Sequence, residues 1–389
     1  MTHTFPGQCL NVNEEQGTVI INVRRFMYSF EPTEDQQIVI SAAKKLAEKD
    51  FRTLMREADE AREPAAEWPA ASWELSLLPA SIPEQYGGFG EPSALTLVLA
   101  AEEMAWGDLG AALVAGAPNL TALPILHCGT EEQKNELLPL YCEESYVPGS
   151  AALMETGIGF NPYALKTTAV LKDGSYVLSG AKCNVPYAAE AEWVLVYASL
   201  DGASQAFLVK KDTPGFIVKE REQNVGMCAY PMYAVELKDC AIPASQRLGG
   251  DKGCDFSLLL SASRTALAAM AVGLARAALE YSIDYAKQRK VFGEALAQRQ
   301  SLAFKLAEFA TDIDAARLLV WKAAWDIDNG KDATTDAYHA KNFAADMARA
   351  MADRSVQILG GYGYTRDFPA ELWLRNACGI EIMEGIATV

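Results

Sequence analysis

The sequence predicts an α+β protein with an N-terminal all-α domain, a middle antiparallel β-barrel or β-sandwich domain and a C-terminal four-helix bundle. Three observations predict this order: helical patterns precede Pro148, short strand-like runs continue to Pro243, and long helical runs begin at Asp255. Half of the 389 residues are hydrophobic, which is typical of a globular protein with a large core. We therefore expect four segments, namely an N-terminal extension (1–29), an N-terminal helical domain (30–148), a middle β domain (149–250) and a C-terminal helical bundle (251–389).

The first helical domain opens with a capping signal. Thr33 can accept hydrogen bonds at a helix start, and Gln36 stands at the third helical position, as a capping box requires. A glycine-rich turn at 83–90 and a second capped start at 129–134 divide the rest of this domain. Residues 1–26 resemble neither a signal peptide nor a targeting helix, so we expect 1–29 to be a loosely packed extension.

Six short strands are predicted in the middle domain, because β-branched and aromatic residues cluster between Asp-Gly and Pro-Gly turns. No helical pattern separates these strands, which favours an antiparallel barrel or sandwich. The predicted strands are 167–171, 176–179, 193–199, 206–209, 216–219 and 233–237.

The C-terminal part contains long periodic runs such as 258–287 and 302–329, joined by loops of few residues. Long neighbouring helices with short connections are typical of a four-helix bundle.

The overall composition excludes several classes of function. With 51 acidic and 34 basic residues the formal charge is −17, so a broad basic surface for nucleic acid is absent. The eight cysteines form no CxxC pair and there are only three histidines, which indicates neither a zinc site nor a disulfide framework. We expect reduced thiols in a cytoplasmic protein. No uninterrupted apolar run reaches about 18 residues, so no membrane span is predicted.

The last thirty-six residues hold the candidate site. Gly360 and Gly361 lack Cβ atoms, so the backbone there can approach a ligand closely. Glu384 stands between Met383 and Gly385, and a carboxylate with apolar neighbours is a candidate base because desolvation raises the pKa of such a group. The alternative is a plain loop with a glycine pair and a solvent-facing glutamate.

Five segments in this order resemble the acyl-CoA dehydrogenase family, flavoenzymes that introduce an α,β double bond into acyl-CoA thioesters. The resemblance implies FAD as cofactor, an acyl-CoA substrate in fatty acid metabolism, and a homotetramer or heterotetramer built as a dimer of dimers. It also implies an electron-transfer flavoprotein as electron acceptor. The five segments are PEQYGGFG (83–90), GTEEQK (129–134), YAKQRKVFGEAL (285–296), QILGGYGY (357–364) and MEG (383–385).

By this resemblance, six residues contact the FAD of a neighbouring subunit. A guanidinium suits a diphosphate and an aromatic ring offers a stacking face. For Arg289 the alternative is a cation that merely favours a helix C-terminus. The six residues are Arg289, Phe292, Gln300, Gln357, Gly360 and Gly361.

Glu384 matches the family's catalytic base, which takes the α-proton of the thioester while a hydride leaves the β-carbon for flavin N5. The family stabilises the developing carbonyl charge with the backbone N–H of the base residue and a flavin hydroxyl. Arg264 and Gly385 match the surroundings of the base and substrate, with a structural ion pair as the alternative for Arg264. Some members place the base just before that arginine, where this chain has Ser263, which cannot serve.

The flavin-ring side departs from the family pattern. Glu155 and Gly157 match its first flavin-binding segment, but a hydroxyl residue that bonds the ring is replaced by Met154 and a serine near the diphosphate by Phe160. In the second segment, a stacking tryptophan and a hydroxyl residue are replaced by Asn184 and Pro186, and proline also lacks a backbone N–H.

Two hypotheses follow. The chain is a divergent FAD-dependent acyl-CoA dehydrogenase, or it is a non-catalytic partner subunit of a heteromeric one, with its own flavin site degenerate. Oxygen-using flavin chemistry on the same scaffold is a third possibility, because fold does not determine reaction.

Overall fold

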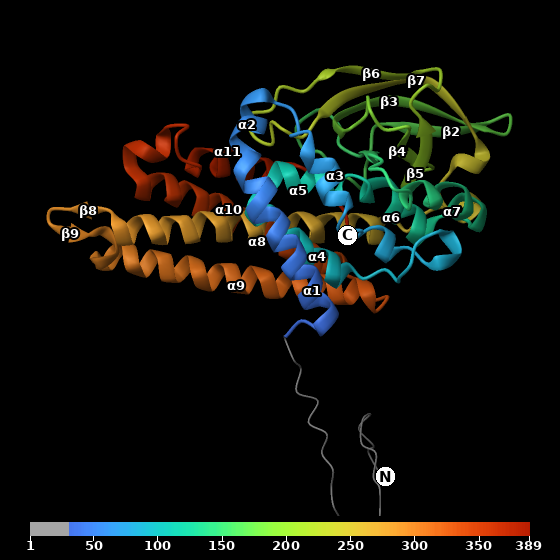
Figure 1. The fold of residues 1–389 in the computed structure, drawn as a ribbon. Helices are drawn as coiled ribbons and strands as arrows, with labels where there is room; N and C mark the ends of the chain where they lie inside the picture. The colour runs from blue at the N-terminus through green and yellow to red at the C-terminus, as the bar shows by residue number, and fades with distance from the viewer. Residues whose placement is uncertain (1–30) are drawn as a thin grey trace, which may run out of the picture.

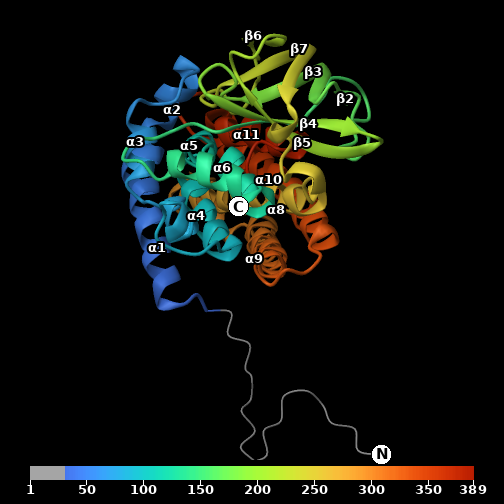
Figure 2. The same ribbon diagram turned by 90° about the vertical axis from the view of Figure 1, so that its right-hand side faces the viewer.

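The computed structural model describes residues 31–389, so the predicted extension at 1–29 lies outside the described residues. The β domain lies on one side of a thick layer of helices, and the blue and cyan N-terminal helices cross the orange and red C-terminal helices (Figures 1 and 2). The order α, then β, then α is the predicted one.

The N-terminal domain begins with the predicted capping box. The Thr33 side chain accepts from the Gln36 backbone N–H, and the Gln36 side chain accepts from the Thr33 backbone N–H. Thr130 and Gln133 repeat the arrangement at the second predicted start. A five-residue π-helical turn (Ala47–Phe51) joins the first two helices. The helices are α1 (Glu34–Leu46), α2 (Arg52–Ala61), α3 (Glu67–Trp73), α4 (Ala94–Gly107), α5 (Leu109–Gly116), α6 (Asn119–Cys128) and α7 (Glu131–Leu137).

The middle domain is one sheet in which all six predicted strands are present, most of them longer than predicted. Its order is β1-β4-β2-β3-β7-β6, with β5 paired to β4 outside this path. Most pairs are antiparallel, but β1 and β2 each pair with β4 in parallel. The three-residue β1 was not predicted, because so short a segment shows no period. The strands are β1 (Ser150–Ala152), β2 (Thr168–Lys172), β3 (Ser175–Pro186), β4 (Trp193–Leu200), β5 (Ala203–Lys210), β6 (Phe216–Arg221) and β7 (Met232–Pro243).

The C-terminal bundle is built around one long buried helix, α8. This helix packs against α9, α10 and α11, and α4 of the N-terminal domain covers it as well. A small hairpin, β8 (Lys290–Val291) and β9 (Glu294–Ala295), joins α8 to α9. The helices are α8 (Phe256–Gln288), α9 (Gln300–Asp328), α10 (Thr334–Leu359) and α11 (Ala370–Ile382).

Within residues 31–389, α8 is the one helix long and apolar enough to cross a membrane by itself, and the bent pair α5 and α6 passes the same test together. The apolar stretch of α8 is 94% buried inside the protein. Its composition therefore reflects its place in the core, where neighbours cover all of its faces.

Candidate functional site

Glu384 lies just beyond the end of α11, and its carboxylate meets Arg264 of α8. The Arg264 Nε lies 3.2 Å from Oε1 and 3.3 Å from Oε2 of Glu384, and the Arg264 Nη2 lies 3.1 Å from Oε1. Only 10% of the Arg264 side chain and 14% of the Glu384 side chain are exposed. The structure thus brings these two predicted residues together, but Glu384 sits in an ion pair and not in a purely apolar environment.

A second cation approaches the same carboxylate. Lys341 of α10 is 5% exposed, and its Nζ lies 3.9 Å from Oε1 of Glu384. Burial lowers the pKa of Lys341, and the charge of Glu384 acts in the opposite direction. The sequence did not single out Lys341. The available signal was a lone lysine at an inward helical position among buried alanines.

The backbone after Glu384 presses against the β domain. The Glu384 N–H donates to Sδ of Met154 at 3.4 Å. Gly385 has φ of +71°, and a Cβ at this position would lie 2.8 Å from the Leu153 side chain. Glycine is therefore required at 385 both for its backbone conformation and for this close contact.

The Glu155 carboxylate accepts three hydrogen bonds. Its Oε2 accepts from the Lys166 N–H at 2.7 Å, and its Oε1 accepts from the Thr167 N–H at 2.8 Å and from Lys182 Nζ at 2.9 Å. Burial opposes ionisation, but hydrogen bonds from Lys182 and Thr167 outweigh it and lower the pKa of Glu155 to about 2. Burial lowers the pKa of Lys182 to about 8. Both groups are therefore charged at neutral pH, and Glu155 orders the loop that carries Gly157.

A second cluster lies at the outer end of α8. The Arg289 guanidinium is 5.8 Å from the centre of the Tyr362 ring, so the β8–β9 end of α8 meets the predicted glycine turn. Phe292 is 94% exposed in the hairpin. A Cβ at Gly360 or Gly361 would meet nothing within 4 Å. The remaining two predicted residues, Gln300 and Gln357, are both exposed.

The two clusters are far apart within one chain. Arg264 lies within α8, and Arg289 is the residue that caps its C-terminus. They are 25 positions apart in the chain (289 − 264). At 1.5 Å per residue this is about 37 Å along the helix. Figure 1 shows the hairpin β8–β9 at the far tip of the α8–α9 pair. The glycine turn, near Arg289, and Glu384, beside Arg264, therefore belong to two separate clusters within one chain.

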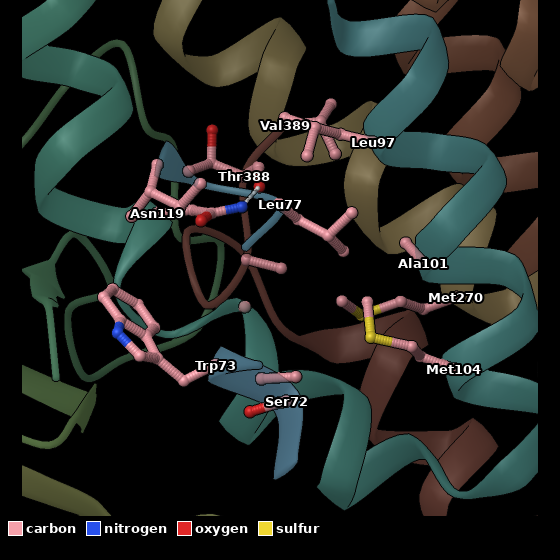
Figure 3. Close-up of a pocket in the computed structure, with 14 residues that line it drawn as sticks. Ser72, Trp73, Leu77, Leu97, Ala101, Met104, Asn119, Met270, Thr388 and Val389 are labelled. Carbon is pink, nitrogen blue, oxygen red and sulfur yellow. Dashed lines mark hydrogen bonds between the residues drawn. The ribbon is translucent and has the colours of Figure 1, made fainter. Parts of the chain in front are cut away.

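Cavities flank the segment that follows Glu384. One of about 40 Å³ lies between α4, α5 and α8, and its wall includes Met104, Met270 and Val389 (Figure 3). The Asn119 side-chain amide donates to the Thr388 carbonyl at 3.4 Å beside it. A larger cavity of about 690 Å³ reaches from Val389 to the connection between α9 and α10. Residues 387–389 therefore border the smaller cavity, and Val389 also borders the larger one.

The residues present fit the diphosphate half of an FAD. Arg289 offers an exposed guanidinium, and the open backbone at Gly360 and Gly361 allows close approach. In the two segments predicted to hold the flavin ring, Met154 and Pro186 provide no side-chain hydroxyl. The Asn184 side-chain oxygen already accepts from the Asn224 amide at 2.9 Å.

Three sequence models of known domains match this chain. They are described as acyl-CoA dehydrogenase N-terminal domain, middle domain and C-terminal domain, and they match residues 33–145, 150–240 and 256–389. A Bacillus subtilis (strain 168) protein named "Probable acyl-CoA dehydrogenase YngJ" is 36% identical over 372 residues, which cover 93% of this chain and 97% of that protein.

Solved structures agree with these matches. Butyryl-CoA dehydrogenase from Megasphaera elsdenii has a TM-score of 0.84 at 33% identity, with 92% of this chain and 96% of that chain covered. A glutaryl-CoA dehydrogenase from Mycobacterium smegmatis in complex with FADH2 has a TM-score of 0.82 at 26% identity, with 91% and 92% covered.

Proposed function

The chain belongs to the acyl-CoA dehydrogenase family, and from this membership we propose that it dehydrogenates an acyl-CoA thioester with Glu384 as the α-proton base. One observation carries the assignment of the base: the Glu384 carboxylate is held by the Arg264 guanidinium at 3.1–3.3 Å, and the next residue, Gly385, borders a small cavity that Ser263 of α8 also lines. A general base must be held in a fixed orientation within reach of the proton that it removes.

Three groups take part in the proposed step, namely Glu384, Arg264 and FAD. The Cα–H bond of the thioester breaks, its proton passes to a Glu384 oxygen and its electron pair forms the new double bond, while the Cβ–H bond breaks and its hydrogen leaves as hydride for the oxidant. Arg264 orients the carboxylate through Nε and Nη2. FAD, when bound, supplies the two-electron oxidant for the β-carbon.

The backbone N–H of Glu384 is the proposed donor to the thioester carbonyl. In the structure this N–H donates to Met154 Sδ at 3.4 Å. A thioether is a weak acceptor, so a carbonyl oxygen that gains negative charge competes well for the same N–H. The Met154 side chain then moves aside when substrate binds.

The second cluster is proposed to serve FAD across a subunit interface. Arg289, with the open turn at Gly360 and Gly361, fits a diphosphate, yet lies about 37 Å along α8 from Arg264. A homotetramer or heterotetramer built as a dimer of dimers brings such clusters to neighbouring sites. We include an electron-transfer flavoprotein as the electron acceptor in this proposal, on family resemblance.

A non-catalytic partner subunit is the second candidate. It is favoured by the flavin-ring side, where Met154 contacts the backbone of the base and Pro186 has no N–H to donate. In that case Arg289 and the glycine turn serve a catalytic neighbour, while the chain's own site performs no reaction.

The visible spectrum of the purified protein separates the two candidates. A catalytic subunit binds FAD, is yellow, and is bleached without oxygen by one member of a panel of acyl-CoA thioesters. Glu384→Gln is expected to retain FAD and to slow bleaching by about 10²–10⁴-fold, because a positioned base contributes about that factor.

Glu381→Gln is the matched control, since this carboxylate lies three residues earlier, is exposed, and pairs with Arg349 at 2.7 Å. It should bleach like the wild type. A protein that stays colourless with added FAD contradicts catalysis by this chain and supports the partner subunit. Unchanged bleaching of Glu384→Gln removes this residue from the role of base.

A further inference from the structure

Lys341 is a charged residue in a core position of α10. It is 5% exposed, and its helix neighbours Ala337, Ala340, Ala344 and Ala345 are buried. A buried ammonium is costly unless other groups compensate for the lost hydration. The groups that surround Lys341 therefore indicate what it does.

Two contacts connect Lys341 to the base segment. Its Nζ donates to the backbone carbonyl of Glu381 at 3.0 Å and lies 3.9 Å from Oε1 of Glu384. Glu381 is in the last turn of α11, where helix carbonyls have no partner within the helix. One ammonium group thus joins the end of α11 to the carboxylate three residues later.

Arg264 and Lys341 approach Glu384 from different helices, α8 and α10. Arg264 also lies over the ring of Tyr338, one turn before Lys341, at 5.3 Å. The other charged groups that act on Lys341 are Glu381 of α11 and Asp346 of α10. From the β domain, Met154 reaches Glu384 with an uncharged side chain.

We propose that Lys341 is a positioning residue that, from α10, holds the Glu384 carboxylate in its reactive place together with Arg264 from α8. Arg264 alone fixes the carboxylate relative to α8, while the β-domain contact fixes only its backbone. Lys341 adds the link to α10 and to the end of α11. This inference rests on the proposed role of Glu384 as base.

Lys341→Met tests the proposal in the FAD-loaded enzyme. We expect kcat to fall by about 10–100-fold while KM changes less than about threefold, because a small displacement of a catalytic group is costly. Lys341→Arg, which keeps a cation at this position, should restore most of kcat.

Arg349→Met is the matched control. Arg349 also belongs to α10 and pairs with the side chain of Glu381, but it is half exposed and Glu384 is not its partner. Its loss weakens the same α10–α11 connection and should leave kcat unchanged. An equal effect of both variants shows that Lys341 only supports packing, and overturns the proposal.

Thermal unfolding tests the contact between Lys341 and Glu384 without depending on catalytic activity. The effects of Lys341→Met and Glu384→Gln on Tm should be non-additive, because interacting residues couple in a double-mutant cycle. If Lys341→Met does not fold, Lys341→Gln, which keeps an N–H donor without the charge, takes its place in both experiments. An active Glu384→Gln enzyme overturns this inference and the proposed function together. An inactive Glu384→Gln with a wild-type-like Lys341→Met overturns this inference alone.

Discussion

At the scale of one residue, Asp108 caps a helix at a place where burial disfavours its charged form. Its side chain caps α5 by accepting from the Ala111 N–H at 2.9 Å, and it is 4% exposed. Burial raises the pKa of Asp108 to about 6, although the Ala111 hydrogen bond and Arg52 oppose the shift. Arg52 is itself held between two indole rings, 4.3 Å from Trp106 and 5.2 Å from Trp373.

Asp108→Asn is expected to stabilise the protein at neutral pH. The folded-state pKa of about 6 exceeds the ordinary value of 3.8, so wild-type stability is lost as pH rises through that interval. Two pKa units correspond to about 3 kcal/mol, and asparagine keeps the capping oxygen. The Tm of the variant should therefore exceed that of the wild type at pH 7.5 and come close to it at pH 4.5.

Asp212→Asn, on an exposed turn, is the control for this comparison. Its Tm difference from the wild type should not vary between the two pH values. A pH-independent difference for Asp108→Asn would show that this carboxyl does not titrate abnormally.

At the scale of elements, the buried pair of Lys182 and Glu155 fastens strand β3 to the loop after β1. Lys182 is 1% exposed, and its Nζ also donates to the Leu153 carbonyl at 3.1 Å. Leu153 in turn packs against Gly385. The ion pair thus supports the wall of the β domain that faces the base segment.

Lys182→Met is expected to destabilise the protein by about 3–5 kcal/mol, because it leaves a buried carboxylate without its cation. The double variant with Glu155→Gln should recover part of this loss. Denaturant unfolding measures both. Lys219→Met removes an exposed ion pair of the same sheet, with Glu236 at 2.7 Å, and should cost less than about 1 kcal/mol. Equal losses at the two lysines would contradict a special role for the buried pair.

At the scale of the whole molecule, α8 separates the two residue clusters along its length. Its first half carries Arg264 in the buried centre, and its C-terminal cap carries Arg289 at the exposed tip. Because about 37 Å of helix lies between them, one bound FAD is expected to draw its two halves from two protomers.

Subunit complementation tests this arrangement. Arg289→Leu and Glu384→Gln should each be inactive as homo-oligomers. When dissociated and reassembled together in equal amounts, they should regain about a quarter of wild-type activity, because half the dimers are mixed and each has one intact site. Mixing without dissociation is the control. Mixed oligomers that remain inactive would show that Arg289 acts within its own chain.

Much of the fold was determined locally. The capping boxes at Thr33 and Thr130 and the long helical periods of α8 and α9 depend on residues a few positions apart, and they were predicted to within about two residues. The order of helical and strand segments follows from the same short-range patterns. The parallel partners of β4 were not predictable, since strand pairing joins residues distant in the chain.

The candidate site also contains residues that the sequence singled out and residues that only the tertiary structure brought to it. The sequence alone, through its resemblance to a family, singled out Glu384 and Arg264, which lie 120 positions apart and form an ion pair in the fold. Only the tertiary structure placed Lys341 beside Glu384 and Met154 against its backbone N–H. Side-chain period shows that a residue faces inward, but the packing of α10 against α11 decides which group it meets there.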